Sequence, residues 1–69
     1  MKAKQLTEVR VLTSQVKKGD RFSRGNYDEV AESDAYINPR NGCWSVDIYN
    51  DLIYGWQSID TEITVHRMS

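Results

Sequence analysis

The chain has 69 residues and a net charge of −1, so it is long enough for one small domain and lacks the strong positive charge of many nucleic-acid binders. Apolar residues make up 39% of the chain and charged residues 28%, a globular composition that excludes wholesale disorder. There is no apolar run long enough to cross a membrane, and Cys43 is the only cysteine, so we expect a cytoplasmic protein without a disulfide.

The chain begins with a basic segment and a first predicted strand. Residues 1–5 contain Lys2 and Lys4 but no apolar stretch, so we expect a flexible basic N-terminus rather than a secretion signal. In 7–13 the valines alternate with charged residues. This period of two predicts a half-buried strand.

A turn and a short second strand are expected next. Lys-Gly-Asp at 18–20 favours a turn, because glycine supplies positive φ and aspartate can bond to the backbone that follows. A strand over 20–24 should follow, with Phe22 as its apolar residue. Gly25 and Asn26 can adopt left-handed conformations, which predicts a tight connection to the next element.

Residues 27–38 are compatible with two structures. As a strand, they place Val30 and Ile37 on opposite faces, so both point inward only if a β-bulge shifts the register. As a helix over 27–37, they place several apolar residues on one stripe, with acidic side chains in the first turn. We favour the bulged strand and keep an α+β fold with a short helix at 27–37 as the alternative.

The clearest strand is 43–50, which follows a turn predicted at Asn41-Gly42. Its alternation places Trp44 and two aliphatic residues on one face and Tyr49 on the other. The period fails over 50–60.

Alternation resumes in 61–67, whose pattern is similar to that of 7–13. Two similar strands at the chain ends suit the closing seam of a barrel, which would remove exposed strand edges. We therefore predict an all-β fold, a small SH3-like antiparallel barrel or roll of about five strands in one domain, 1–69. The predicted core is Val9, Val11, Val16, Phe22, Val30, Ile37, Trp44, Val46, Ile48, Ile59, Ile63 and Val65.

Two short stretches carry a resemblance to known proteins. They are Val16, Lys17, Gly19, Asp20 and Arg21 after the first predicted strand, and Thr64, Val65 and Arg67 near the end. In these stretches and in its strand count, the chain resembles SH3-like barrels and the small accessory proteins encoded by bacteriophages of mycobacteria and related hosts. The resemblance implies a viral protein made in the host cytoplasm, where many such proteins bind a host protein. It implies no catalytic residue.

The sequence gives no support to catalysis or to a cofactor. His66 is the only histidine, and with Cys43 as the only thiol no spacing resembles a zinc site. A Cys–His nucleophilic pair would need the fold to bring these two residues together. The four glycines stand singly, so no phosphate-binding loop is formed. We expect a protein that is not an enzyme and binds no cofactor or metal.

Protein binding is the function that the aromatic residues favour. Tyr54 and Trp56 flank Gly55 in a predicted loop, where large aromatic side chains either fold back onto the barrel end or form a contact surface. Tyr49 should point to solvent from its strand. The predicted protein-binding residues are Tyr36, Tyr49, Tyr54 and Trp56. The partner is either a host protein or a second copy of the chain.

Nucleic-acid binding is the alternative. Residues 1–24 carry seven basic and two acidic side chains, whereas 25–69 carry two basic and eight acidic ones. Small barrels bind nucleic acids by stacking bases on aromatic residues and by following phosphates with Lys and Arg. The candidates are Lys17, Lys18, Arg21, Arg24 and Arg40, with Lys2 and Lys4 in support.

Overall fold

The structure is a computed structural model, and it describes residues 6–68. Within these residues the chain forms strands joined by turns. The strands are β1 (Leu6–Leu12), β2 (Arg21–Arg24), β3 (Tyr27–Val30), β4 (Tyr36–Ile37), β5 (Trp44–Asp47), β6 (Ile53–Gly55) and β7 (Glu62–Met68). A short 3-10 turn, η1 (Thr13–Gln15), and a second short turn, η2 (Tyr49–Asp51), in which Asn50 and Asp51 have positive φ, complete the elements. The predicted all-β class is confirmed. The segment predicted as a flexible N-terminus, 1–5, lies outside the described residues.

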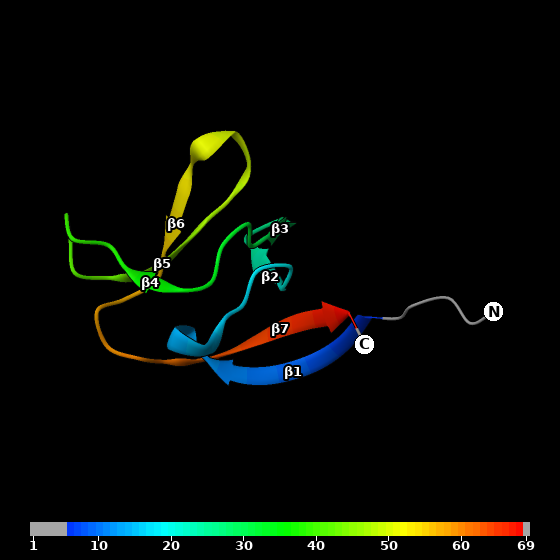
Figure 1. The fold of residues 1–69 in the computed structure, drawn as a ribbon. Helices are drawn as coiled ribbons and strands as arrows, with labels where there is room; N and C mark the ends of the chain where they lie inside the picture. The colour runs from blue at the N-terminus through cyan, green and yellow to red at the C-terminus, as the bar shows by residue number, and fades with distance from the viewer. Residues whose placement is uncertain (1–5, 69) are drawn as a thin grey trace.

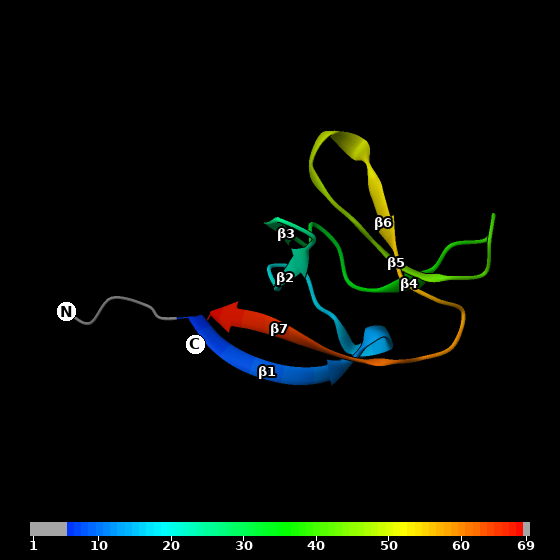
Figure 2. The same ribbon diagram turned by 180° about the vertical axis from the view of Figure 1, so that it is seen from behind.

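The strands form two antiparallel sheets (Figures 1 and 2). The first has the order β1-β7-β2-β3 and the second the order β4-β5-β6. The long strands β1 and β7 pair along their whole length, with Val9 opposite Val65, so the predicted similar strands at the chain ends do lie side by side. In the described residues the pairing of strands gives two separate sheets instead of a closed ring.

Residues 27–38 are divided between the two sheets, so neither a bulged strand nor a helix at 27–37 is correct. β3 ends at Val30, and the buried Ala31 exchanges backbone hydrogen bonds with the Gly19–Asp20 turn. The Glu32 N–H then donates to the carbonyl of Asp47 in β5 over 2.7 Å. The chain therefore crosses from one sheet to the other between β3 and β4.

A small set of apolar side chains fills the space between the sheets. The buried members are Val11, Val16, Phe22, Ala31, Val46, Ile48 and Val65, and the partly buried members are Val9, Ala35, Tyr54, Trp56 and Ile63. Each aliphatic side chain that is fully buried contributes about 1.5–3 kcal/mol. Trp44, predicted to be core, is only half-buried.

Three residues of the predicted core are exposed instead. Val30, Ile37 and Ile59 are 40%, 52% and 72% exposed. Val30 lies opposite Arg21, and the neighbouring Glu29, opposite Phe22, takes the buried position in β3. Glu29 is accommodated there because Arg24 Nη1 lies 3.2 Å from its carboxylate. A charged residue thus holds the inward position that the pattern had assigned to an aliphatic one.

The Lys-Gly-Asp stretch forms the predicted turn. Gly19 has φ 96°, and the Asp20 N–H donates to the Lys17 carbonyl over 3.0 Å, as in a type II turn. The Asp20 carboxylate is buried and accepts two hydrogen bonds of 2.8 Å from Arg67 in β7, one from Nε and one from Nη2. The two stretches that carry the phage resemblance therefore meet at this ion pair.

Candidate protein-binding surface

The β5–β6 hairpin projects from the body of the molecule (Figure 1). Its turn has Asn50 and Asp51 at φ 59°, and the Leu52 N–H donates to the Tyr49 carbonyl over 3.2 Å. Positive φ at both central residues is the geometry of a type I′ turn, whose twist matches that of paired strands. Asn and Asp are the residues other than glycine that tolerate it best. The local sequence thus explains the break in alternation after Ile48.

Three apolar side chains gather at this turn. Tyr49, Leu52 and Ile53 are 47%, 48% and 51% exposed. We call these three residues the hairpin surface. Scattered exposed apolar residues are normal, but these three lie within five consecutive positions of one projecting turn. The sequence predicted Tyr49 here and missed Leu52 and Ile53. The apolar run that follows Asn50-Asp51 in the sequence could have indicated these two residues.

Acidic side chains border the hairpin surface. Glu32, Asp47 and Asp51 line an open pocket of about 340 Å³ together with Ile48 and Ile53. The surface therefore combines an apolar centre with carboxylates at one side. A matching partner would present an apolar hollow with Lys or Arg beside it.

Tyr36 is held beside the same pocket. Its hydroxyl donates a hydrogen bond of 2.7 Å to Asp47 Oδ1. This hydrogen bond, together with burial and the nearby negative charge, raises the pKa of Tyr36 above its ordinary value. The ring is half-buried, so Tyr36 positions Asp47 and contributes limited contact area of its own.

Tyr54 and Trp56, the other predicted anchors, pack against the core. Their ring centroids lie 5.1 and 5.2 Å from that of Phe22, and 5.4 Å from each other. Because Phe22 is in the first sheet and Tyr54 in the second, this aromatic cluster joins the two sheets. Arg24 lies over the Tyr54 ring, 5.6 Å from its centroid. Tyr54 and Trp56 are both half-buried, which distinguishes them from the exposed Tyr49.

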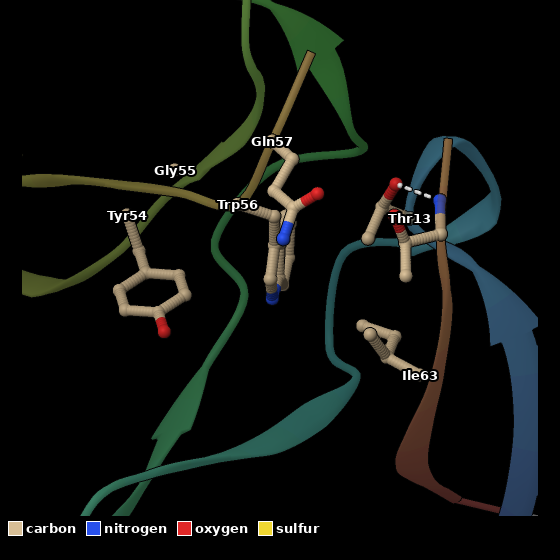
Figure 3. A pocket seen from close by; sticks show the side chains of 7 residues that line it. Thr13, Tyr54, Gly55, Trp56, Gln57 and Ile63 are labelled. Atoms are coloured by element: carbon tan, nitrogen blue, oxygen red, sulfur yellow. Dashed lines mark hydrogen bonds between the residues drawn. The ribbon is translucent and has the colours of Figure 1, made fainter. Parts of the chain in front are cut away.

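Trp56 also borders a second open pocket of about 290 Å³. Figure 3 shows its ring between Tyr54 on one side and Thr13 and Ile63 on the other. The Thr61 N–H donates to Thr13 Oγ1 over 3.2 Å at the far wall. The Trp56 side chain therefore separates the core from this pocket.

The basic residues proposed for nucleic-acid binding do not form one site with exposed aromatic rings. Phe22 is buried, and Arg24 is paired with Glu29 while stacking 5.7 Å from the centroid of Tyr27. Arg40 lies in the β4–β5 turn, which stands apart from the β2–β3 hairpin in both views (Figures 1 and 2).

The remaining basic candidates are also spread over the chain. Lys17 and Lys18 are exposed in the turn before β2, and Arg21 is exposed on that strand. Lys2 and Lys4 lie outside the described residues. In the β2–β3 hairpin, Tyr27 is thus the one aromatic ring exposed near these side chains, since Phe22 is buried.

His66 and Cys43 have separate surroundings. His66 Nε2 lies 3.7 Å from Glu8 Oε1 in the first sheet, whereas Cys43 Sγ lies 3.8 Å from the carbonyl of Asn41 in the β4–β5 turn. Within residues 6–68, no three His, Cys, Asp or Glu side chains are grouped as metal ligands would be.

Searches with the chain found no matching family model, no matching curated protein and no matching solved structure. In residues 6–68, no helix combines the length and apolar character that spanning a membrane requires.

Proposed function

We propose that the protein is a non-enzymatic binding protein whose hairpin surface contacts another protein. The observation that carries the proposal is the exposure of Tyr49, Leu52 and Ile53 together on a turn of defined geometry. An ordered turn loses little conformational freedom on binding, so apolar area buried there contributes efficiently to affinity. Tyr is also among the residues that most often dominate interface energies.

The acidic border specifies the partner further. Glu32, Asp47 and Asp51 favour a partner with basic side chains around an apolar hollow, and their charges should increase the rate of association. The phage resemblance would make this partner a host protein in the cytoplasm. Tyr36 supports the border through Asp47, and Tyr54 and Trp56 hold the sheets from which the hairpin projects.

The test compares two triple variants in an affinity capture from bacterial lysate. The hairpin variant carries Tyr49→Ser, Leu52→Ser and Ile53→Thr. Its matched control carries Val30→Thr, Ile37→Thr and Ile59→Ser, three exposed apolar residues outside the hairpin surface. We expect the wild type and the control to retain the same partner, and the hairpin variant to bind it at least about tenfold more weakly.

The capture is repeated after nuclease treatment and in increasing salt. A partner retained equally by the hairpin variant would contradict the proposal, provided that the variant is folded by circular dichroism. Capture that disappears with nuclease and falls steeply with salt would instead indicate the nucleic-acid function, with Arg21, Arg24 and Arg40 as the residues to test.

A further inference from the structure

β1 lies at the edge of the first sheet, and the phase of its hydrogen bonds follows from one contact. The Thr13 N–H donates to the Thr61 carbonyl over 2.8 Å, so these residues form a hydrogen-bonded pair. Antiparallel ladders alternate between bonded and non-bonded pairs. The residues of β1 that bond to β7 are therefore Thr7, Val9 and Val11.

The alternate residues of β1 direct their backbone N–H and C=O groups away from β7. They are Leu6, Glu8, Arg10 and Leu12. The Gln15 side chain agrees with this phase, because its Oε1 accepts a hydrogen bond of 3.0 Å from the Leu12 N–H. Gln15 thus covers one end of the edge, and the backbone groups of Glu8 and Arg10 face outward along its middle.

The sequence of β1, LTEVRVL, is self-complementary when two copies run antiparallel. If the pair is centred on Val9, Glu8 lies opposite the partner's Arg10, and Leu6 lies opposite the partner's Leu12. Outward-facing residues then meet outward-facing residues, as hydrogen-bonded pairs require. Directly opposite side chains of opposite charge stabilise such a pairing.

Charge also disfavours the neighbouring registers. A shift by one residue would place outward-facing backbone groups against inward-facing ones, so the smallest allowed shift is by two. That shift places Glu8 opposite the partner's Glu8 or Arg10 opposite the partner's Arg10. Like charges directly opposite destabilise a strand pair, so the register centred on Val9 is preferred.

Charges within each chain extend this complementarity. Arg10 Nη2 lies 2.6 Å from Glu62 Oε1, and His66 Nε2 lies 3.7 Å from Glu8 Oε1. Across the pair, each Arg10 would stand between its own Glu62 and the partner's Glu8. The positive and negative side chains then alternate across both sheets on their outer face.

We propose that the protein forms a two-fold symmetric homodimer through antiparallel pairing of the β1 strands, centred on Val9. The two four-stranded sheets become one continuous sheet, which removes an exposed edge in each copy. Leu6 and Leu12, both exposed in the single chain, would cover each other across the interface.

The dimer does not depend on the function proposed for the hairpin surface. In both views the β1 strand and the tip of the β5–β6 hairpin lie on opposite sides of the molecule (Figures 1 and 2). A dimer would therefore keep both hairpin surfaces accessible and present them to a partner together.

Two measurements on the full chain test the dimer. Sedimentation equilibrium should give a mass that rises with concentration toward twice that of the chain. Amide hydrogen exchange by NMR should show protection of the Glu8 and Arg10 amides that increases with concentration. The Val9 and Val11 amides, which bond to β7, should be protected at every concentration.

Charge variants test the register. Glu8→Arg places like charges opposite each other at two symmetric positions, so we expect the dissociation constant to rise by about tenfold or more. Adding Arg10→Glu to that variant restores opposite charges across the interface and should recover dimerisation. The same double variant removes the attraction to Glu62 and His66 within each chain, so recovery cannot come from those contacts.

A proline pair tests the backbone contact. Arg10→Pro removes an outward-facing N–H without removing a bond to β7, and it should abolish the dimer. Asp28→Pro is its control on β3, the strand at the opposite edge of the sheet. The Ala31 N–H donates to the Asp20 carbonyl, so by the same alternation the Asp28 N–H faces outward. Asp28→Pro should leave the mass unchanged.

A single-chain mass at millimolar concentration would overturn the proposal. So would a dimer whose Glu8 and Arg10 amides exchange freely, or one that Glu8→Arg and Arg10→Pro leave intact. If Arg10→Pro does not fold, the exchange pattern of the wild type and the charge variants still decide between these outcomes.

Discussion

At the scale of single residues, Asp20 is the side chain on which the stability of the fold depends most. It closes the Lys17–Asp20 turn through its backbone and holds Arg67 through its carboxylate. Burial alone would raise the pKa of Asp20, but the hydrogen bonds from Arg67 and Lys17 and the charge of Arg67 outweigh it, and the pKa lies below its ordinary value. The charged form of Asp20 therefore stabilises the fold.

Asp20→Asn should lower the free energy of unfolding by about 2 kcal/mol at pH 7, because it leaves Arg67 without its charged partner. The pKa of Asp20 is lower in the folded than in the unfolded chain. Its contribution is therefore present above the unfolded value and is lost as the pH falls below about 5 toward the folded pKa. The difference between wild type and variant in urea unfolding should thus shrink at acid pH.

Asp28→Asn, on the exposed outer face of β3, is the matched control and should change stability by less than about 0.5 kcal/mol at either pH. A difference between Asp20→Asn and wild type that stays constant from pH 7 to pH 3 would show that the ion pair with Arg67 is not what Asp20 contributes.

At the scale of elements, alternation was a good guide to the long strands and a poor one to the short connections. It predicted β1, β7 and the inward Val46 and Ile48, because one buried face imposes a period of two. It could not predict β6, since three residues are too few to show a period. The type I′ turn at Asn50-Asp51 lacks the glycine that usually marks such a turn.

The positive φ of Asp51 leads to a prediction about the hairpin. Asp51→Gly should raise the free energy of unfolding by about 0.5–1 kcal/mol, because glycine adopts this conformation without the steric cost of a Cβ. Gly25→Ala is the reverse change, since Gly25 has φ 62°, and it should lower stability by about 1 kcal/mol. Thermal unfolding of both variants would measure the two effects. A loss of stability in Asp51→Gly would contradict the turn assignment.

The limited reach of local periodicity also explains why the bulged strand predicted over 27–38 is wrong. The sequence showed that Val30 and Ile37 could not share a face in a regular strand, but it did not show that neither is buried. Glu29 takes the inward position because Arg24, from the neighbouring strand, neutralises it. Such a pairing depends on which strands become neighbours, and local periodicity does not contain that information.

At the scale of the whole molecule, two sheets share one thin core, and the aromatic cluster of Phe22, Tyr54 and Trp56 connects them. The sequence placed Phe22 in the core correctly. For Tyr54 and Trp56, which it selected as protein-binding residues in a loop, it left open whether they fold back onto the barrel end or form a contact surface. Their inward packing depends on β6 lying beside β5 and facing β2, which is a long-range arrangement. The aromatic residues therefore divide into a structural group and the exposed Tyr49.

This division can be measured as a difference in stability. Trp56→Ala should cost about 2 kcal/mol, since a large half-buried ring is lost from the contact between the sheets. Trp56→Phe keeps a ring there and should cost less than about 1 kcal/mol. Tyr49→Ala should cost similarly little, because Tyr49 is exposed. Equal losses for Trp56→Ala and Tyr49→Ala in urea unfolding would show that the two groups are not distinct.

The most direct measurement of the proposed function is photo-crosslinking at the hairpin surface. A benzoylphenylalanine is placed at Leu52 in one preparation and at the exposed Ile59 in another, and each is irradiated in bacterial lysate. We predict one dominant protein adduct from position 52. Excess wild-type protein and the Val30, Ile37 and Ile59 control variant should suppress it, and the Tyr49, Leu52 and Ile53 variant should suppress it much less. An adduct that forms equally from position 59, or that the hairpin variant suppresses as well as wild type does, would contradict the account.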